Sequence, residues 1–417
     1  MLACLLFALV THLDVTVDGP GLTRPRALMR LMDTQAGAAF DPEQLERDLA
    51  RLRSLGILYD VTAQASPDGK SVAVRASDRW SLLPVLGLRR GGGRTTARVG
   101  VTDHNVGGEL FTAYGELTSN AEVPFVSQRS GDRIGNLVYV EVPRLLGTRV
   151  TPGLYWTRDF LDFAAFRDDG SVGYLFDRAR YDLRGELRFE LTRLVTLLAG
   201  VDGRLDRYRT SDVSPSPGAA PRAVDTLWGL AGVQVGYVEQ ELSQSRGAQL
   251  DLTLEAARQG LLSDLGALSG TLRAQRYLVP APAHNLCLQF LVQATTGKDE
   301  TFLFRSGGLR EIRGFLDAFF TGAFLARANA EWRVDVLRET LVIPVIGQLA
   351  AFSDSGWVAR RAGAVSGLDY EGPILSVGAG VRLIPIPFAR AVARLDVATG
   401  LYPRRTLDIS FSGQQFF

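Results

Sequence analysis

The chain has 417 residues, and its 46 basic and 45 acidic side chains leave a net charge of +1. This balance excludes a surface dominated by one sign of charge and gives no indication of nucleic acid as a partner. The two cysteines, Cys4 and Cys287, lie too far apart in the sequence to suggest a disulfide framework or a cysteine metal site. A hydrophobic content of 46% is not typical of a bundle of membrane helices.

The first residues are apolar without interruption from Leu2 to Val10. This run is about half as long as the ~20 residues that a transmembrane helix needs. It resembles the apolar core of a secretory signal, although no basic residue precedes it and no clear small-residue cleavage site follows it. Residues 1–12 are therefore predicted to be a signal or N-terminal segment, and the start of a first strand is the alternative.

Residues 13–78 are predicted to form a small α/β domain with the order strand, helix, helix, strand, strand. Apolar and polar residues alternate from Leu13 onward, as they do in a half-buried strand. The second helix has an N-cap at Asp41, a proline at its first position in Pro42, and a stop at Gly56. A Pro-Asp-Gly turn then joins the last two strands.

Residues 79–93 are predicted to be a linker, because the run Gly91-Gly92-Gly93 follows two arginines and would act as a hinge. No Pro/Ser-rich stretch or acidic run divides the chain after this point. The remainder, residues 94–417, is therefore expected to be one architecture rather than several soluble domains.

The predicted architecture of residues 94–417 is a membrane barrel. In the clearest segment, residues 181–191, every even position is charged and almost every odd position is apolar. A period of two marks a strand with one polar and one apolar face. About 16 such segments occur without helices to cover them, and a membrane strand takes about 9–11 residues. We predict a mainly β protein, a transmembrane antiparallel barrel of about 16 strands preceded by the small α/β domain, in preference to a soluble sandwich.

One long loop of the predicted barrel, at about residues 298–320, has unusual chemistry. It contains the run Ile312, Arg313, Gly314 and Phe315. A loop that folds back into a barrel lumen enters a partly desolvated space, where a guanidinium needs a carboxylate. Glu331 and Asp354 lie on polar faces of the strands that follow, so both are candidate partners. Gly314 would permit a sharp turn, and Phe315 would wedge the loop against the wall. The alternative is an exposed hairpin tip.

Enzymatic sites were searched for and none is predicted. The chain has three histidines, His12, His104 and His284, and none is near a candidate nucleophile or a second metal ligand. No G-x-S-x-G elbow and no phosphate-binding loop with Gly-Lys-Ser/Thr occurs. We therefore expect no catalysis, no cofactor and no metal.

Residues that carry a family resemblance occur throughout the chain. In the small domain they are Gly37, Phe40, Leu45, Leu55, Gly56 and Tyr59. In the predicted barrel they are Gly100, Val101, Asn105, Gly107, Gly108, Pro143, Arg144, the run at residues 312–315, the strand motif Phe352-x-Asp354-x-Gly356, and the terminal Phe417. Together they resemble the BamA/TamA superfamily of outer-membrane assembly factors and two-partner secretion transporters, over nearly all of the chain.

The resemblance implies that residues 13–78 form one POTRA domain and that Phe417 belongs to the C-terminal signal of an outer-membrane barrel. It favours Asp354 as the partner of Arg313, with Phe352 and Gly356 completing a second family signature. The contact would lock the loop inside the barrel.

The function implied by the resemblance is insertion or assembly of outer-membrane proteins. The POTRA domain would capture an unfolded client, which would enter the membrane through a seam between the first strand, about 94–101, and the last, 406–416. Alternatives are a two-partner secretion pore, for which two POTRA units are more common, and a passive diffusion channel. The expected location is a bacterial-type outer membrane with the POTRA domain in the periplasm, and the expected partners are unfolded outer-membrane or secreted clients, accessory envelope proteins and membrane lipid.

Overall fold

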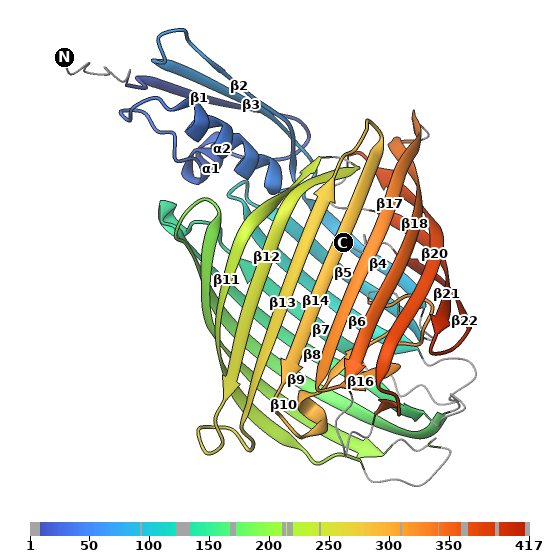
Figure 1. Ribbon diagram of the computed structural model, residues 1–417. Helices are drawn as coiled ribbons and strands as arrows, with labels where there is room; N and C mark the ends of the chain where they lie inside the picture. The colour runs from blue at the N-terminus through green and yellow to red at the C-terminus, as the bar shows by residue number, and fades with distance from the viewer. Residues whose placement is uncertain are drawn as a thin grey trace, which may run out of the picture.

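The computed structural model consists of a small domain at one mouth of a large barrel (Figure 1). It describes residues 9–91, 94–121, 134–166, 172–210, 214, 220–241, 243–308, 311–340, 342–359, 366–387 and 392–412. Most of the predicted signal or N-terminal segment lies outside these residues. Neither helix in the described ranges is long and apolar enough to cross a membrane.

The small domain has the order of elements that the sequence predicts. Its elements are β1 (His12–Asp18), α1 (Pro25–Leu31), α2 (Pro42–Ser54), β2 (Leu58–Ala65) and β3 (Ser71–Asp78). Strand β3 is central, with β1 parallel on one side and β2 antiparallel on the other. The carboxylate of Asp41 caps α2 by accepting a hydrogen bond from the backbone N–H of Glu43 at 2.9 Å. Leu28, Leu52 and Leu58 are almost fully buried between the helices and the sheet.

Sixteen long strands form the barrel wall in the described part of the chain, and the sheet closes on itself. They are β4 (Leu82–Gly91), β5 (Arg94–Val106), β6 (Phe111–Ala121), β7 (Ile134–Glu141), β8 (Val150–Phe166), β9 (Val172–Glu190), β10 (Val195–Thr210), β11 (Val224–Glu241), β12 (Gln244–Ala257), β13 (Ala267–Leu278), β14 (His284–Thr295), β17 (Phe324–Thr340), β18 (Pro344–Ala359), β20 (Gly372–Pro385), β21 (Ala393–Tyr402) and β22 (Thr406–Ser412). The predicted fold class is confirmed.

Shorter elements lie in the connections. They are the 3₁₀ turns η1 (Leu145–Gly147) and η2 (Glu300–Phe302) and the short strands β15 (Phe304–Ser306), β16 (Phe320–Gly322) and β19 (Gly367–Leu368).

The predicted linker at 79–93 is wrong for most of its length. Residues Leu82 to Gly91 form strand β4, which pairs with β5 from Leu82 opposite Asp103 to Gly91 opposite Arg94. The first barrel strand is therefore β4 and not the segment 94–101. Gly91, the first residue of the glycine run, is the last residue of β4 and pairs with Arg94 at the start of β5. Gly92 and Gly93 lie outside the described residues.

The wall has its apolar side outward. On β9, Leu183 and Leu187 are 49% and 55% exposed, whereas Glu186 on the opposite face is 4% exposed. In a water-soluble sheet the carboxylate would be exposed and the leucines buried. An exposed apolar outer face around a charged interior is the arrangement of a barrel that faces lipid.

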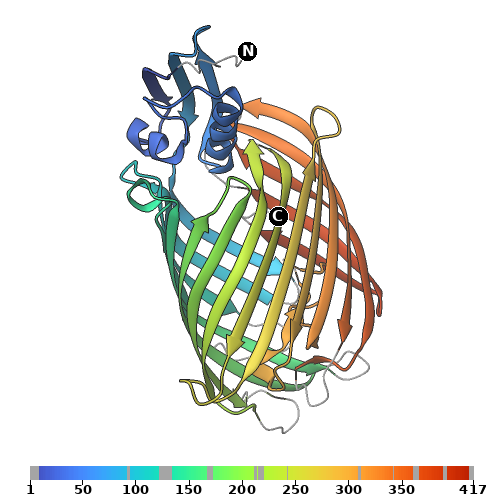
Figure 2. The ribbon, with the colours of Figure 1, turned by 60° about the vertical axis from the view of Figure 1, so that its left-hand side comes forward.

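The small domain lies at one mouth of the barrel (Figure 2), and arginine contacts join the two. Arg144, in the turn between β7 and β8, donates to the carboxylate of Asp33 at 3.0 Å and to the carbonyl of Leu31 at 3.1 Å. Its Nη2 donates to the carboxylate of Glu190, the last residue of β9, at a distance of 2.6 Å. Burial raises the pKa of Asp33, but the hydrogen bond and charge of Arg144, together with the charges of Arg51 and Arg149, lower it, so its net pKa lies below the ordinary value.

A second anchor lies in the turn between β5 and β6. The carboxylate of Glu109 is surrounded by three arginines of the small domain, Arg24, Arg26 and Arg30, with the Arg30 contact at 2.7 Å. Arg30 also donates to the backbone carbonyl of Glu109 at 3.0 Å. Two adjacent turns of the barrel thus hold the small domain by charge-assisted contacts.

Arg144→Ala should loosen the small domain at the barrel mouth, because Asp33 and Glu190 lose their closest shared cation and keep only the longer contacts of Arg51, while the barrel wall keeps its own hydrogen bonds. Spin labels at Lys70 and Val342 should report a broader distance distribution in the variant. The ionised carboxylate of Asp33 contributes its full stabilisation of the interface above the ordinary aspartate pKa of about 3.9. This stabilisation is lost only as the pH falls through the lowered pKa of Asp33 in the folded protein. The wild-type distribution should therefore be constant between pH 8 and about pH 5.

Arg75→Ala, an exposed arginine on β3, is the matched control for this measurement. If the two variants gave the same narrow distribution as the wild type, Arg144 would not be the anchor.

Candidate functional site

The connection between β14 and β17 enters the barrel and carries the candidate site. Within it, β15 pairs with β16, and β16 contacts β19 through Phe320 opposite Leu368. Strand β19 also pairs with the end of β8, Gly367 opposite Ala165. Figure 1 shows β16 at the end of the barrel opposite the small domain. Residues 309 and 310 of this loop lie outside the described ranges.

The guanidinium of Arg313 is held by two carboxylates. Its Nε and Nη2 donate to the two oxygens of Asp354 at 2.8 and 2.7 Å, and its backbone N–H donates to the same carboxylate at 3.0 Å. Its Nη1 donates to Glu331 at 2.5 Å. All three side chains are fully buried. The guanidinium also stacks on Phe352, with Cζ 3.3 Å from the ring centroid. Both candidate partners predicted from the sequence therefore contact Arg313.

The Arg313 contact is part of a larger ionic network in the lumen, which we call the lumen network. Its members in the described residues are Arg313, Arg333, Arg382, Arg394, Glu331, Asp354 and Asp396. Glu331 also accepts from Arg333 at 2.7 Å and from Arg382 at 3.2 Å. Asp396 accepts from Arg382 at 2.5 Å and lies 3.2 Å from Arg394. Strands β17, β18, β20 and β21 are thus joined through their inner side chains.

Glycine at position 314 is required by both conformation and space. Its φ of +88° is in the left-handed region, and a Cβ there would lie 2.8 Å from the backbone nitrogen of Gly400. The hydroxyl of Thr406 donates to the Gly314 carbonyl. Phe315 beside it is 2% exposed and packs in an edge arrangement against Phe320. The loop tip therefore sits directly on the inner surface of β21 and β22.

Each named residue of the motif Phe352-x-Asp354-x-Gly356 on β18 faces a residue of the loop. Phe352 stacks on the Arg313 guanidinium, and Asp354 binds its fork. A Cβ at Gly356 would lie 2.8 Å from Cδ1 of Ile312, so only glycine leaves room for this isoleucine. Spacing of two places all three positions on one face of the strand, which explains why the motif skips alternate residues.

Several members of the lumen network were not predicted from the sequence. Arg382 and Asp396 lie on β20 and β21, and Asn329 donates its side-chain amide to Asp354 at 3.0 Å and to the carbonyl of Glu311 at 2.8 Å. Their alternating position marks them as lumen residues. Nothing in that pattern says which of them lie at the same height as Arg313. Phe417, the predicted C-terminal signal, lies outside the described residues.

The described residues contain no group of three or more His, Cys, Asp or Glu side chains arranged to hold a metal ion. The imidazole of His284 accepts a hydrogen bond from Trp332 Nε1 at 3.1 Å. Cys287 is a buried free thiol on the lumen side of β14, opposite Glu331.

Comparison with known families gives the identity of the small domain. The family model POTRA, described as "Surface antigen variable number repeat", matches residues 13–76. The small domain is a POTRA domain. No curated protein matches the sequence.

Solved structures share the fold of the whole chain. BamA from Haemophilus ducreyi lacking POTRA domains 1–3 has 15% identity and a TM-score of 0.54 over 96% of this chain and 84% of that chain. CdiB from Acinetobacter baumannii has 13% identity and a TM-score of 0.63 over 97% of this chain and 73% of that chain. CdiB from Escherichia coli has 13% identity and a TM-score of 0.67, with coverage of 97% and 76%. The predicted resemblance to the BamA/TamA superfamily is confirmed by the POTRA match and this shared POTRA-barrel fold.

Arg313→Ala should destabilise the barrel by about 3–5 kcal/mol, because it leaves the buried Asp354 without the guanidinium that binds both of its oxygens and removes one of the three cations bound to Glu331. Urea unfolding in lipid vesicles measures this loss. In a double-mutant cycle with Asp354→Ala, the coupling energy should exceed about 1 kcal/mol. Arg313→Lys should lose most of the stabilisation, because an ammonium keeps the charge but not the two-pronged geometry.

Arg273→Ala, which removes an exposed arginine on β13, is the matched control and should leave unfolding unchanged. Strict additivity of Arg313→Ala and Asp354→Ala would mean that the two side chains do not stabilise the loop together.

Proposed function

We propose that this protein inserts or assembles β-barrel proteins in the outer membrane of a bacterial-type cell, with the POTRA domain in the periplasm. The POTRA domain captures an unfolded client, and the client enters the membrane through the seam between β4 and β22. The observation that carries this proposal is the end of β22 that extends past β4 at that seam.

The seam differs from the other strand junctions of the barrel. Within the described residues, β22 is in register with β4 only at Phe411 opposite Arg90. By contrast, β4 pairs with β5 along its whole length. The antiparallel register places Thr406 and Leu407 beyond the distal end of β4. Because backbone groups in lipid must be paired, a strand end that extends past its neighbour is a place where the junction can accept a new strand.

The POTRA domain offers a sheet edge for an extended client segment. In its sheet β3 is central, and β2 lies at one edge with a register shift between Tyr59 and Thr62. An exposed edge binds an extended peptide through backbone hydrogen bonds, which suits clients of varied sequence. The arginine contacts described above hold this domain at the same mouth at which β4 begins.

A passive diffusion channel fits the lumen poorly. Counted from β4, β8 is the fifth strand and β18 the thirteenth of sixteen, so they lie on opposite walls. The loop elements β16 and β19 connect these walls, and a buried apolar cluster fills the space around them. Its buried members are Phe166, Ile312, Phe315, Phe319, Phe320, Val358, Leu368 and Ile374. This bridge crosses the barrel at the mouth away from the POTRA domain.

A two-partner secretion pore remains the second candidate function, because the fold agrees with two CdiB structures as well as with BamA. The two functions use different routes. A secretion pore exports its partner through the lumen and requires the bridge to move, whereas an insertase uses the seam in the wall.

A disulfide across the seam tests the insertase. In a Cys4→Ser, Cys287→Ser background, Arg90→Cys with Phe411→Cys should form a disulfide, because the two positions are opposite in register. In proteoliposomes, the oxidised protein should no longer accelerate the folding of a small unfolded outer-membrane barrel protein. Folding is monitored as the protection of that protein from protease. Adding a reductant should restore the acceleration of folding.

The matched control is a disulfide between Val397→Cys and Ile409→Cys, which joins β21 to β22 without closing the seam. Unchanged insertion with an oxidised seam would exclude lateral opening. If oxidised protein still exported a secreted client, the secretion function would be favoured instead.

The bridge predicts low ion conductance. In planar bilayers the wild type should show no large steady open state, and replacing residues 304–322 by a short Gly/Ser segment should produce one, because the replacement removes β15 and β16 and with them the contacts to β19. Replacing residues 258–266, a loop at the same end that hydrogen-bonds to the start of β11, is the control and should not change conductance. A steadily open wild-type channel would support passive diffusion.

A further inference from the structure

A basic and aromatic patch lies on the outer face of β8, β9 and β10, at the end away from the POTRA domain. Along β8 the outward side chains are Leu154 and Trp156, which are 55% and 38% exposed, followed by Arg158 on the same face. Along β10 the outward Val201 and Leu205 are followed by Arg207. The apolar outer band therefore ends in arginines on two strands.

On β9 the boundary is marked by a tyrosine. Leu187 and Leu183 face outward, and Tyr181 continues the same face directly opposite Arg158 in the sheet register. Aromatic side chains with a polar end are enriched at the edge of the lipid-facing band of a barrel. All three strands thus change from apolar to polar or aromatic side chains near the same height.

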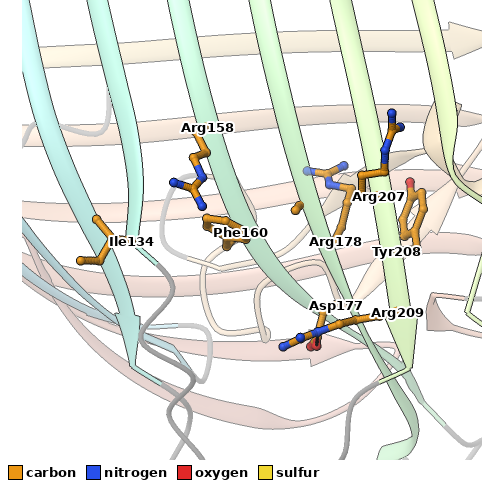
Figure 3. A pocket seen from close by; sticks show the side chains of 9 residues that line it. Ile134, Arg158, Phe160, Asp177, Arg178, Arg207, Tyr208 and Arg209 are labelled. Atoms are coloured by element: carbon orange, nitrogen blue, oxygen red, sulfur yellow. Dashed lines mark hydrogen bonds and ion pairs between the residues drawn. The ribbon is translucent and has the colours of Figure 1, made fainter.

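The arginines surround a hollow of about 520 Å³ on this face (Figure 3). It is lined by Ile134, Arg158, Phe160, Asp177, Arg178, Ala179, Arg207, Tyr208 and Arg209. Figure 3 shows the side chains of Arg158, Arg207 and Arg209 spread around it, with Asp177 beside Arg209. Most of the lining residues belong to the outward set, while Arg178 and Tyr208 come from the inner faces of β9 and β10.

Arg158 has no carboxylate partner among the described residues. Its Nε is buried and makes no hydrogen bond there. The guanidinium instead stacks between two rings, 4.7 Å from the centroid of Phe160 and 5.7 Å from that of Tyr181. Directly opposite on β7 is Asn136, whose buried side-chain oxygen also has no partner in the described structure. Arg158 and Asn136 form a polar pair at the edge of an apolar surface. The Nε of Arg158 and the side-chain oxygen of Asn136 can each still make a hydrogen bond.

The neighbouring arginines each bind a carboxylate. Arg209 binds Asp177 through Nε at 2.9 Å and is 65% exposed, so most of its donors face outward. Arg207 binds the carboxylate of Asp225, which has Asp264 beside it, and is 45% exposed. Among the described residues, Arg158 is therefore the one arginine of the three that binds no carboxylate. A charged arginine at the edge of a membrane is stabilised by an anionic headgroup that lies at the same depth.

We propose that the hollow on β7 to β10 binds the phosphorylated headgroup of an anionic lipid from the leaflet away from the POTRA domain. A phosphate oxygen accepts from the guanidinium of Arg158, whose planar donor set matches phosphate geometry. Arg207 and Arg209 neutralise the remaining charge of the headgroup. The acyl chains lie against the exposed Leu154, Trp156 and Leu205 below. An acidic soluble protein would leave this apolar surface uncovered, so the lipid fits both halves of the site.

The test measures lipid retention by the detergent-purified full chain in native mass spectrometry. The probes are lipid A with two phosphates and zwitterionic phosphatidylcholine, each titrated separately, and inorganic phosphate as competitor. The wild type should bind lipid A more tightly than phosphatidylcholine. Arg158→Ala should weaken lipid A binding by about fivefold, the contribution of one arginine near a lipid surface. Arg158→Lys should recover part of this loss.

Arg338→Ala is the matched control, because Arg338 is an exposed arginine at the POTRA end of the wall. Arg209→Ala provides a second, more exposed variant, should Arg158→Ala disturb folding, and should also weaken lipid A binding. Equal losses in Arg158→Ala and Arg338→Ala would overturn the site. Equal affinity for phosphatidylcholine would overturn its selectivity for anionic headgroups. Displacement of lipid A by an equal concentration of inorganic phosphate would show that free phosphate, not a lipid, is the ligand.

Discussion

The interior of this barrel depends on the desolvation of one guanidinium. Arg313 is fully buried, and a charge in that position is stable only if carboxylates and hydrogen-bond acceptors surround it. Asp354 and Glu331 supply them from two adjacent strands of the wall. A loop that carries such a charge has few other low-energy positions in the lumen. The ion pairs therefore determine where the loop lies as well as how tightly it is held.

The position of the loop determines the shape of the lumen. Once Arg313 is bound, Gly314 lies against β21, and β16 is placed where it pairs with β19. Strand β19 in turn reaches β8 on the opposite wall. One buried ion pair is thus connected, through short backbone pairings, to the bridge across the distal mouth. The bridge does not include β4, but the loop tip contacts β22 through Thr406, so one strand of the seam touches the loop.

The sequence predicts the features that depend on local periodicity and misses those that depend on closure. Alternation along each segment predicts about 16 strands and their inner faces, because the period of a strand is a property of consecutive residues. The first strand is assigned wrongly because its glycine run suits a hinge as well as a hairpin. Arg382 and Asp396 are missed because they meet Arg313 only after four strands are aligned in register. Arg144 is missed as an anchor for the same reason, since Asp33 is more than a hundred residues earlier.

The lumen network and the Arg144 contact at the POTRA interface differ in exposure, and this difference assigns them different mechanical roles. In the lumen network, Arg313, Glu331 and Asp354 have no exposed side-chain area, so neither salt nor bulk water screens them. At the POTRA interface, Arg144 is 4% exposed but its partners Asp33 and Glu190 are 28% and 24% exposed. Partly exposed pairs contribute less and weaken with ionic strength. The POTRA domain can therefore change its position at the barrel mouth while the loop stays fixed.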